Sequence, residues 1–147
     1  MRTIKKFNIK FINMDAKKLK YYEKKYERNP VEDAIKDISN KWTLHILRDL
    51  FLGKTHFNEF QTNRKTLDNK SLTRCLKTME NNGLIKRLDE NDEITYHLTE
   101  KGHSLNKVFY ELLLFALNND KNNEHYNDYE KEELKEMYLE ILDLNQE

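Results

Sequence analysis

The sequence predicts a mainly helical α+β fold that contains one small β-hairpin. Glycine and proline are scarce, with three glycines and one proline in 147 residues, and this composition disfavours turn-rich all-β folds. Hydrophobic residues recur at helical spacing through most of the chain, whereas residues 84–99 have the pattern of two short strands. The length suits one domain with extensions at its ends.

Residues 1–28 are expected to form a basic N-terminal arm and helix. The segment carries ten basic and three acidic residues. Phe7, Ile9 and Phe11 alternate with a period of two, which indicates a short strand or an extended arm. Tyrosines such as Tyr22 then recur at helical spacing, and they make this helix a candidate for dimerisation.

The body of the protein is expected to span residues 29–119 and to open with two helices. Pro30 suits the first turn of a helix, from which Ile35 and Ile38 would face inward. The second helix lies in KWTLHILRDLF and ends at Gly53. Its inward side carries Trp42, Ile46, Leu47 and Leu50.

A short helix, a longer helix and a hairpin follow. The short helix lies in HFNEFQT, where Phe57 and Phe60 are three residues apart. Asp68 is a good cap for the next helix, NKSLTRCLKTMENN, which stops at Gly83. The segments LIKRLD and EITYHLT are typical of two strands, and ENDE would connect them.

One long helix is expected to complete the body, with Thr99 as its cap. Its sequence, EKGHSLNKVFYELLLFALNN, places Leu105, Phe109, Leu112 and Phe115 on one apolar face. Residues 120–147 then supply an acidic linker and an amphipathic helix. This last helix either contributes to dimerisation or packs on its own chain, and the sequence favours neither.

From KWTLHILRDLF onward, the predicted order of elements is three helices, a two-stranded hairpin and a further helix. This is the order of a winged helix-turn-helix, in which the third helix enters the major groove of DNA. The predicted fold is therefore a winged helix-turn-helix with helical extensions at both ends.

The motifs of this region resemble those of the HxlR-type transcriptional regulators, relatives of the MarR winged-helix group. They are PVEDA, KWT, FNE, LTRCLK, GLI and LTEKG, and the resemblance covers roughly residues 29–117. It implies a dimeric regulator that binds double-stranded DNA, with repression as the expected action. The richness in Lys, Asn and Ile indicates a prokaryotic source, and a cytoplasmic protein is expected because no signal peptide or membrane span is evident. Family members often carry a sensing cysteine where this chain has Asn29, and Asn40 replaces the usual glycine before Lys-Trp. We therefore expect a thiol-independent regulator, with any small-molecule effector at the dimer interface.

The helix over residues 68–82 is the predicted DNA-reading element. Leu72, Leu76 and Met79 recur at i, i+4 and i+7 and would face the core, with Cys75 beside them. The opposite face carries Lys70, Ser71, Thr73, Arg74, Lys77 and Thr78. Arginine forks to guanine, lysine neutralises phosphate and hydroxyls bond bases or backbone. An ordinary solvated helix has a similar face, but the place between a short helix and a hairpin favours reading of a palindromic operator.

Six further residues are candidates for phosphate contacts around this helix. They are Lys54, His56, Arg64, Lys65, Lys86 and Arg87. Each is also interpretable as an ordinary surface cation. Four acids occupy the hairpin tip, Asp89, Glu90, Asp92 and Glu93, so the tip is expected to stay off the DNA.

No enzymatic, metal or cofactor chemistry is expected. The five histidines have no metal-ligand spacing, the single cysteine excludes a thiolate cage, and no phosphate-binding loop is present. No segment is apolar enough to be a signal peptide or a membrane span. An alternative to the DNA regulator is a winged-helix module for protein–protein interaction with little DNA specificity, because the net charge is zero and the hairpin tip is acidic.

Overall fold

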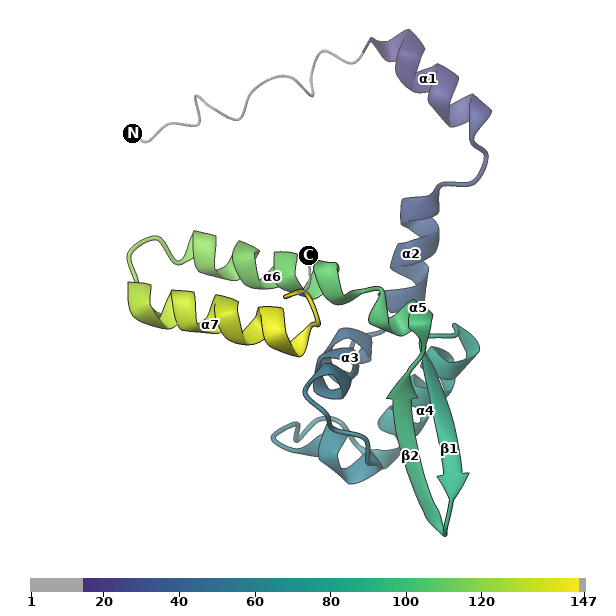
Figure 1. The fold of residues 1–147 in the computed structure, drawn as a ribbon. Helices are drawn as coiled ribbons and strands as arrows, with labels where there is room; N and C mark the ends of the chain where they lie inside the picture. Colours follow the sequence, from purple (N-terminus) through teal and green to yellow (C-terminus); the bar gives the residue numbers. More distant parts are fainter. Residues whose placement is uncertain (1–14, 146–147) are drawn as a thin grey trace. The chain divides into compact units, whose positions relative to one another are not determined.

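Helices form most of the structure, a computed structural model that describes residues 15–145 (Figure 1). The elements in chain order are α1 (Ala16–Lys25), α2 (Pro30–Ile38), α3 (Thr43–Phe51), the 3-10 helix η3 (Phe57–Gln61), α4 (Asn69–Asn81), β1 (Ile85–Glu90), β2 (Glu93–Leu98), α5 (Glu100–His103), α6 (Asn106–Asn119) and α7 (Asp128–Ile141). The chain divides into two units, residues 1–36 and residues 37–147. The expected combination of helices with one antiparallel hairpin is confirmed.

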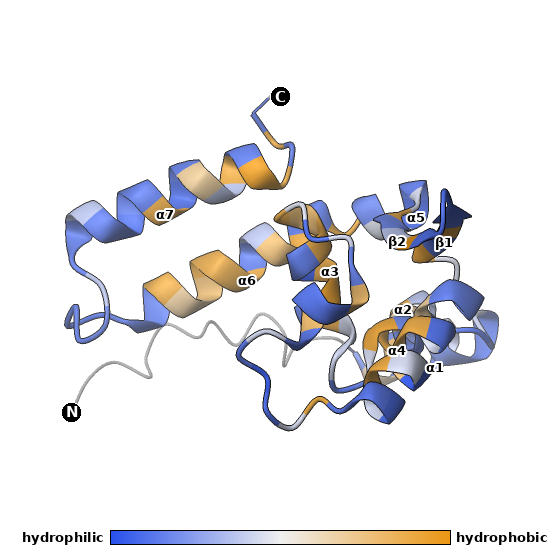
Figure 2. Cartoon of the chain, turned by 90° about the horizontal axis from the view of Figure 1, so that it is seen from below, coloured by the Kyte–Doolittle hydropathy of each residue, from blue (hydrophilic) through white to orange (hydrophobic). Residues whose placement is uncertain are grey.

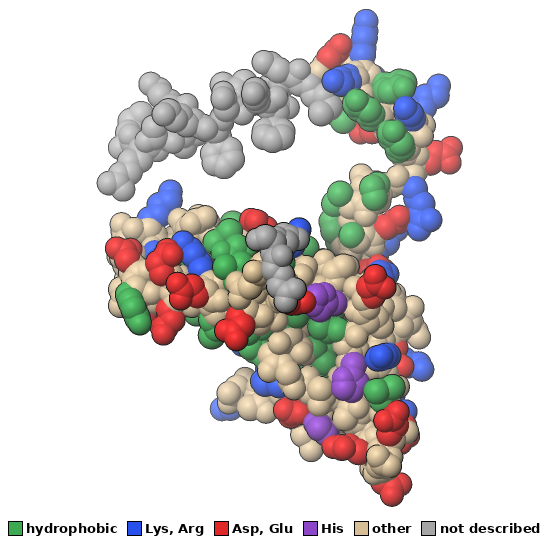
Figure 3. All heavy atoms as spheres, viewed as in Figure 1, with side chains coloured by type: hydrophobic (Ala, Val, Ile, Leu, Met, Phe, Trp, Pro, Cys, Tyr) green, Lys and Arg blue, Asp and Glu red, His purple; other side chains and the backbone are tan. Residues whose placement is uncertain are grey.

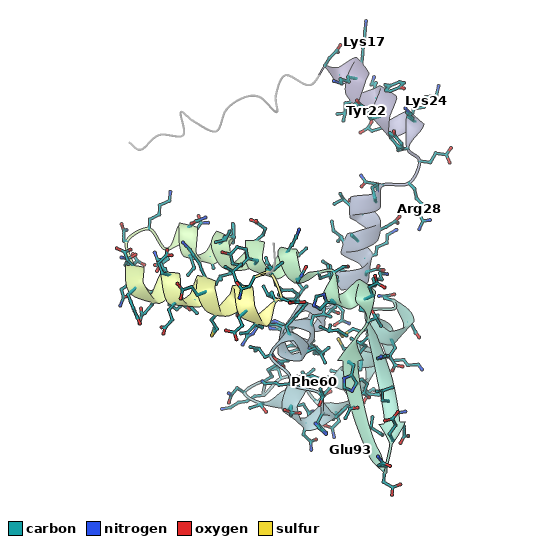
Figure 4. The ribbon with its side chains drawn as sticks, in the orientation of Figure 1. Lys17, Tyr22, Lys24, Arg28, Phe60 and Glu93 are labelled. Atoms are coloured by element: carbon teal, nitrogen blue, oxygen red, sulfur yellow. The ribbon has the colours of Figure 1, made fainter. Side chains whose placement is uncertain are left out.

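The first unit contains the predicted N-terminal helix, α1. Asp15 caps it, because its carboxylate accepts a hydrogen bond of 3.0 Å from the backbone N–H of Lys17. None of the residues of α1 is buried, and Tyr22 (Figure 4) stacks on Tyr26 with ring centroids 6.5 Å apart. The strand or arm expected at residues 7–11 lies outside the described residues.

The second unit is organised around a hydrophobic core shared by α3, η3, α4 and the hairpin. Ile46 and Leu47 of α3 and Phe60 of η3 are fully buried. Leu72, Leu76 and Met79 of α4 meet them with no more than 2% of their surface exposed, so the predicted inward stripe of this helix is confirmed. Trp42 is partly buried against this core. Of the two residues predicted to face inward from α2, Ile38 is partly buried against this core, and Ile35, which belongs to the first unit, is 48% exposed.

The hairpin is tighter than the sequence suggested. Glu90 pairs with Glu93, so ENDE is not a four-residue connection and only Asn91 and Asp92 form the turn. Both turn residues have positive φ angles, 53° and 61°, and Asn and Asp tolerate this conformation in two-residue hairpin turns better than most residues. The edge of β2 that does not pair with β1 forms a hydrogen bond with the segment before η3, because the Tyr96 N–H donates to the Thr55 carbonyl at 2.8 Å.

The single long helix expected after Thr99 is instead two helices, α5 and α6. Ser104 interrupts the helix by donating its hydroxyl hydrogen to the Lys101 carbonyl at 2.6 Å. Gly102 is required just before this break, because a Cβ at this position would lie 2.1 Å from the Leu84 carbonyl oxygen. The change of direction brings Phe109 of α6 into the core.

Helices α6 and α7 form an antiparallel hairpin in the second unit (Figure 1). Leu142, just after α7, is 1% exposed and belongs to the core cluster, and its carbonyl accepts a hydrogen bond of 3.1 Å from the Asn106 side chain. The apolar face expected on α6 is only partly buried, because Leu112 and Phe115 remain 45% and 69% exposed. Figure 2 shows the hydrophobic colouring along α6.

Candidate nucleic-acid interface

The outer face of α4 brings together the residues predicted to read DNA. Asp68 caps the helix by accepting a hydrogen bond of 2.7 Å from the Ser71 N–H. The exposed side chains beyond this cap are Lys70, Thr73, Arg74, Lys77 and Thr78, while Ser71 is half-buried. A concavity of about 570 Å³ runs along this face and is lined by these five exposed residues and Asn69. One side of α4 is thus buried and the other is polar, basic and accessible.

The electrostatics of this face favour an anionic ligand. The hydrogen bonds from Ser71 lower the pKa of Asp68, and the charges of Arg74 and Lys70 lower it further. Asp68 therefore caps α4 as a carboxylate at neutral pH. Lys70, Arg74 and Lys77 form no ion pair with any residue in the range 15–145. Their positive charges are available to a partner.

One member of this surface, Asn69, was not among the predicted residues. Its side-chain oxygen accepts a hydrogen bond of 2.8 Å from Gln61 of η3, and Gln61 also donates to the Leu67 carbonyl at 3.2 Å. This pair links the two helices of the helix-turn-helix. An Asn directly after the cap Asp68 was the available signal, because amides in the first turn of a recognition helix suit contact with adenine.

Arg64 does not have the free, exposed side chain that a predicted phosphate contact requires. Its guanidinium forms a forked ion pair with Asp49 of α3, whose side chain is fully buried, and only 13% of the Arg64 side chain is exposed. It also donates to the Phe60 carbonyl at 2.7 Å. A cation buried against a carboxylate has little left to offer to phosphate, so Arg64 stands apart from the exposed candidates, and its phosphate contact remains a prediction.

Lys54 and His56 are also engaged by carboxylates. The Lys54 ammonium lies 3.7 Å from the Asp49 carboxylate. His56 contacts Glu59 of η3 at 2.9 Å through Nδ1. Through Nε2 it contacts Glu93 of the hairpin formed by β1 and β2, which we call the wing. The hydrogen bonds to Glu93 and Glu59 raise the pKa of His56 above 6.5. These two residues connect parts of the fold, and a role in DNA contact remains a prediction.

The remaining candidates lie on the turn before α4 and on the wing. Lys65 and Lys86 are exposed, and neither forms an ion pair within the described part of the chain. Arg87 is exposed and lies 3.8 Å from Asp89. The acids of the wing tip gather at the lower end of the molecule in the space-filling view (Figure 3).

The described residues contain no cluster of His, Cys, Asp or Glu that would hold a metal ion. Cys75 is 1% exposed, and burial raises the pKa of its thiol. Among helices of the described chain, none is both long and apolar enough to cross a membrane.

Comparison with known sequences gives several relatives. A sequence profile for HxlR-like helix-turn-helix proteins matches residues 37–124. An uncharacterized HTH-type transcriptional regulator of Methanothermobacter thermautotrophicus is 36% identical over 78 residues, which are 51% of this chain and 60% of the relative. YdeP of Bacillus subtilis is 33% identical over 91 residues, 60% of this chain and 71% of YdeP. YtcD of the same species is 31% identical over 99 residues, 65% of this chain and 79% of YtcD.

Comparison with solved structures gives the same kind of protein. The crystal structure of an HTH-type transcriptional regulator, ytcD, superposes with a TM-score of 0.59 and 29% sequence identity. The superposition covers 64% of this chain and 99% of ytcD. About a third of this chain therefore lies outside the superposition.

Proposed function

This chain belongs to the HxlR-like helix-turn-helix family, and we propose that it is a homodimer that reads a palindromic operator through α4. Its relatives are HTH-type transcriptional regulators, and such a protein has DNA as its partner. The observation that carries the proposal is the outer face of α4, which is polar, basic and free of ion pairs within the described residues, over a fully buried inner face. This is the arrangement that a recognition helix needs to lie in the major groove.

Arg74 and Lys70 are proposed as the main base-reading residues. Both are exposed on the first two turns of α4, and the N-terminal part of a recognition helix approaches the base edges most closely. Thr73, Lys77 and Thr78 continue the face toward the phosphates. Replacement of Arg74 by alanine should cost about 1–3 kcal/mol of discrimination against a wrong base, which is about a 5-fold to 150-fold loss of preference.

Phosphate contacts are proposed for Lys65, Lys86 and Arg87, which are exposed around α4. The wing tip is proposed to stay off the DNA because its acids are exposed and would repel phosphate. Exchange of Asp89 and Glu90 for lysine should then tighten non-specific binding, and weaker binding of this variant would contradict the placement.

Dimerisation and repression complete the proposal. The exposed apolar side chains of α6 are spaced as one stripe and need cover from water, which a second copy of α6 would give. Two recognition helices related by a two-fold axis would lie about 34 Å apart, one turn of DNA. We propose repression rather than activation, because a dimer across its operator blocks access to that DNA without a further interaction surface.

Fluorescence anisotropy with DNA from upstream of the protein's own gene tests the proposal. A shuffled duplex of the same composition is the control, and both are titrated at about 50 and 200 mM salt, where six to ten phosphate contacts cost about three to five decades of affinity. Preference for the native duplex with a steep salt dependence is expected. Arg74→Ala should remove the preference, whereas Lys121→Ala, an exposed cation beyond α6, should leave it unchanged.

The alternative is a winged-helix module that binds protein. The acidic wing tip and the zero net charge are the observations in its favour. Weak, equal binding to both duplexes with little salt dependence would support this alternative, and a pull-down with the purified protein would then identify the partner.

A further inference from the structure

We infer that Arg64 and Asp49 are positioning residues, which set the direction of the recognition helix without contacting DNA. The inference rests on the proposed function, because it assigns these two residues a role in DNA reading. It differs from the sequence-based expectation, in which Arg64 binds phosphate directly.

The geometry of the pair connects three consecutive parts of the helix-turn-helix. The two terminal nitrogens of Arg64 fork onto the two carboxylate oxygens of Asp49, with the Nη2–Oδ1 distance at 3.0 Å. Nη1 also donates to the Phe60 carbonyl of η3 at 2.7 Å, and Nη2 donates to the His45 carbonyl of α3 at 3.4 Å. One guanidinium thus joins α3, the end of η3 and the turn itself.

The turn is also held by Gln61, whose side chain donates to the Leu67 carbonyl at 3.2 Å and to Asn69 at 2.8 Å. Two backbone hydrogen bonds of 3.0 Å flank Arg64, one from its own N–H to the Gln61 carbonyl and one from the Leu67 N–H to the Arg64 carbonyl. Leu67 is 2% exposed and is the single buried hydrophobic side chain between η3 and α4. Since α4 begins two residues after Leu67, the ion pair of Arg64 acts together with these bonds to set where α4 leaves the turn.

The ion pair between Arg64 and Asp49 is shielded from water. The Asp49 side chain is fully buried and that of Arg64 is 13% exposed, so water does not substitute for either partner. A planar fork that meets a carboxylate at two points fixes orientation as well as distance, whereas a lysine offers only a point charge. The Lys54 ammonium lies 3.7 Å from the Asp49 carboxylate. It adds a positive charge beside Asp49 but does not form a second two-point contact.

The test uses a double variant, because loss of one partner alone leaves a buried charge and can unfold the chain. Replacement of a buried ion pair by apolar residues of similar volume is often tolerated, so Asp49→Leu combined with Arg64→Met should stay folded. Operator and shuffled DNA are titrated across salt with this variant and with wild type. The expected result is at least a tenfold loss of operator preference with an unchanged salt slope.

Lys65→Met is the matched control in the same turn. Lys65 is exposed and is proposed to contact phosphate, so its loss should lower the salt slope by about 0.9 and leave the operator preference unchanged. A double variant that behaves like Lys65→Met would show that Arg64 contacts phosphate, and the inference would be wrong. A double variant with wild-type preference and slope would also overturn it.

A second readout needs no DNA. Residual dipolar couplings of the free protein report the angle between α3 and α4, which the double variant should change and Lys65→Met should not. An unchanged angle contradicts the inference even if wild type shows no operator preference. Absence of preference in wild type, with a changed angle in the double variant, would instead count against the proposed function alone.

Discussion

His56 joins the short helix of the helix-turn-helix to the wing. Its two ring nitrogens face Glu59 and Glu93, both of them carboxylates from different elements (Figure 4 labels Glu93). The charged ring donates to both, and this is why the pKa of His56 is raised by the hydrogen bonds to Glu93 and Glu59, while the pKa of Glu59 is lowered by its hydrogen bond to His56.

The contribution of His56 to stability should depend on pH. Because its pKa in the folded protein is raised above 6.5, the pairing is fully present below pH 6.5 and is lost as the pH rises through the raised value. Because the pKa of Glu59 is lowered from 4.5, the contribution of that carboxylate is present above pH 4.5 and is lost as the pH falls through its lowered value. The free energies of unfolding of wild type and His56→Gln, measured by denaturant titration, should therefore differ most between about pH 4.5 and pH 6.5. A difference independent of pH would contradict the ion-pair assignment.

Cys75 should be unreactive in the folded protein. The residue is 1% exposed and its sulfur lies 3.8 Å from the Thr43 hydroxyl, and burial raises the pKa of the thiol above 9.0. Only a small fraction of thiolate is then present at neutral pH, and the thiolate is the reactive form. Ellman's reagent should react with it only as fast as the chain unfolds, and diamide should leave DNA binding intact.

Asn29→Cys is the positive control, because residue 29 is exposed. That variant should react with Ellman's reagent at once. Rapid reaction of wild type, or loss of its DNA binding after diamide that Cys75→Ser prevents, would show a redox-sensitive regulator instead.

At the scale of elements, the helix α7 is expected to stabilise the body. Leu142 at its end is 1% exposed and packs in the core cluster. Leu142→Ala should therefore lower the free energy of unfolding by about 2–5 kcal/mol. Met137 of the same helix is 43% exposed, so Met137→Ala should have a much smaller effect. Equal effects in urea titrations would mean that α7 does not pack on its own chain as the structure describes.

The elements that local patterns predicted well are those with strong caps or a clear period. Asp68 as the cap of α4, and Gly53 and Gly83 as helix ends with φ angles of +86° and +73°, follow from the sequence alone. The break between α5 and α6 was missed, because the tertiary contact that requires Gly102 next to the Leu84 carbonyl leaves no periodic signal.

The sequence predicted which residues share the outer face of α4, but it did not predict the ion pairs around this helix. The period of α4 separates its inner from its outer residues, so Lys70 and Arg74 were placed correctly on the exposed side. The ion pair between Arg64 and Asp49 joins residues fifteen positions apart in the sequence, and that of His56 with Glu93 joins residues thirty-seven apart. No rule of sequence spacing predicts ion pairs between such distant positions. Without knowledge of its partner, a basic residue in a basic segment is therefore interpreted as a phosphate contact.

At the scale of the whole molecule, charge is divided along the chain. Residues 54–87 carry eight basic and three acidic residues, whereas residues 118–147 carry three basic and ten acidic residues. The basic segment contains α4 and the acidic segment contains α7. The net charge of zero therefore conceals a basic segment that contains α4 and an acidic segment that contains α7, and we expect this asymmetry to favour one orientation of the protein on DNA.

The dimer proposal gives the last prediction. Val108, Leu112 and Phe115 recur at i, i+4 and i+7 on α6 and are 40%, 45% and 69% exposed, so they form one apolar stripe on the surface. Burial of a phenylalanine contributes about 1.5–3 kcal/mol, and a two-fold interface buries two copies. Phe115→Ser should thus weaken dimerisation about a hundredfold or more and lower operator affinity with it.

Sedimentation equilibrium measures the first effect and fluorescence anisotropy the second. The matched control is Tyr129→Ser, on α7, where an aromatic side chain is 74% exposed outside the stripe; this variant should dimerise as wild type does. Loss of operator affinity in Phe115→Ser while the protein stays dimeric would place the interface elsewhere. A monomeric wild type that still prefers its operator would mean that one recognition helix suffices, and the two-fold operator would then have no basis.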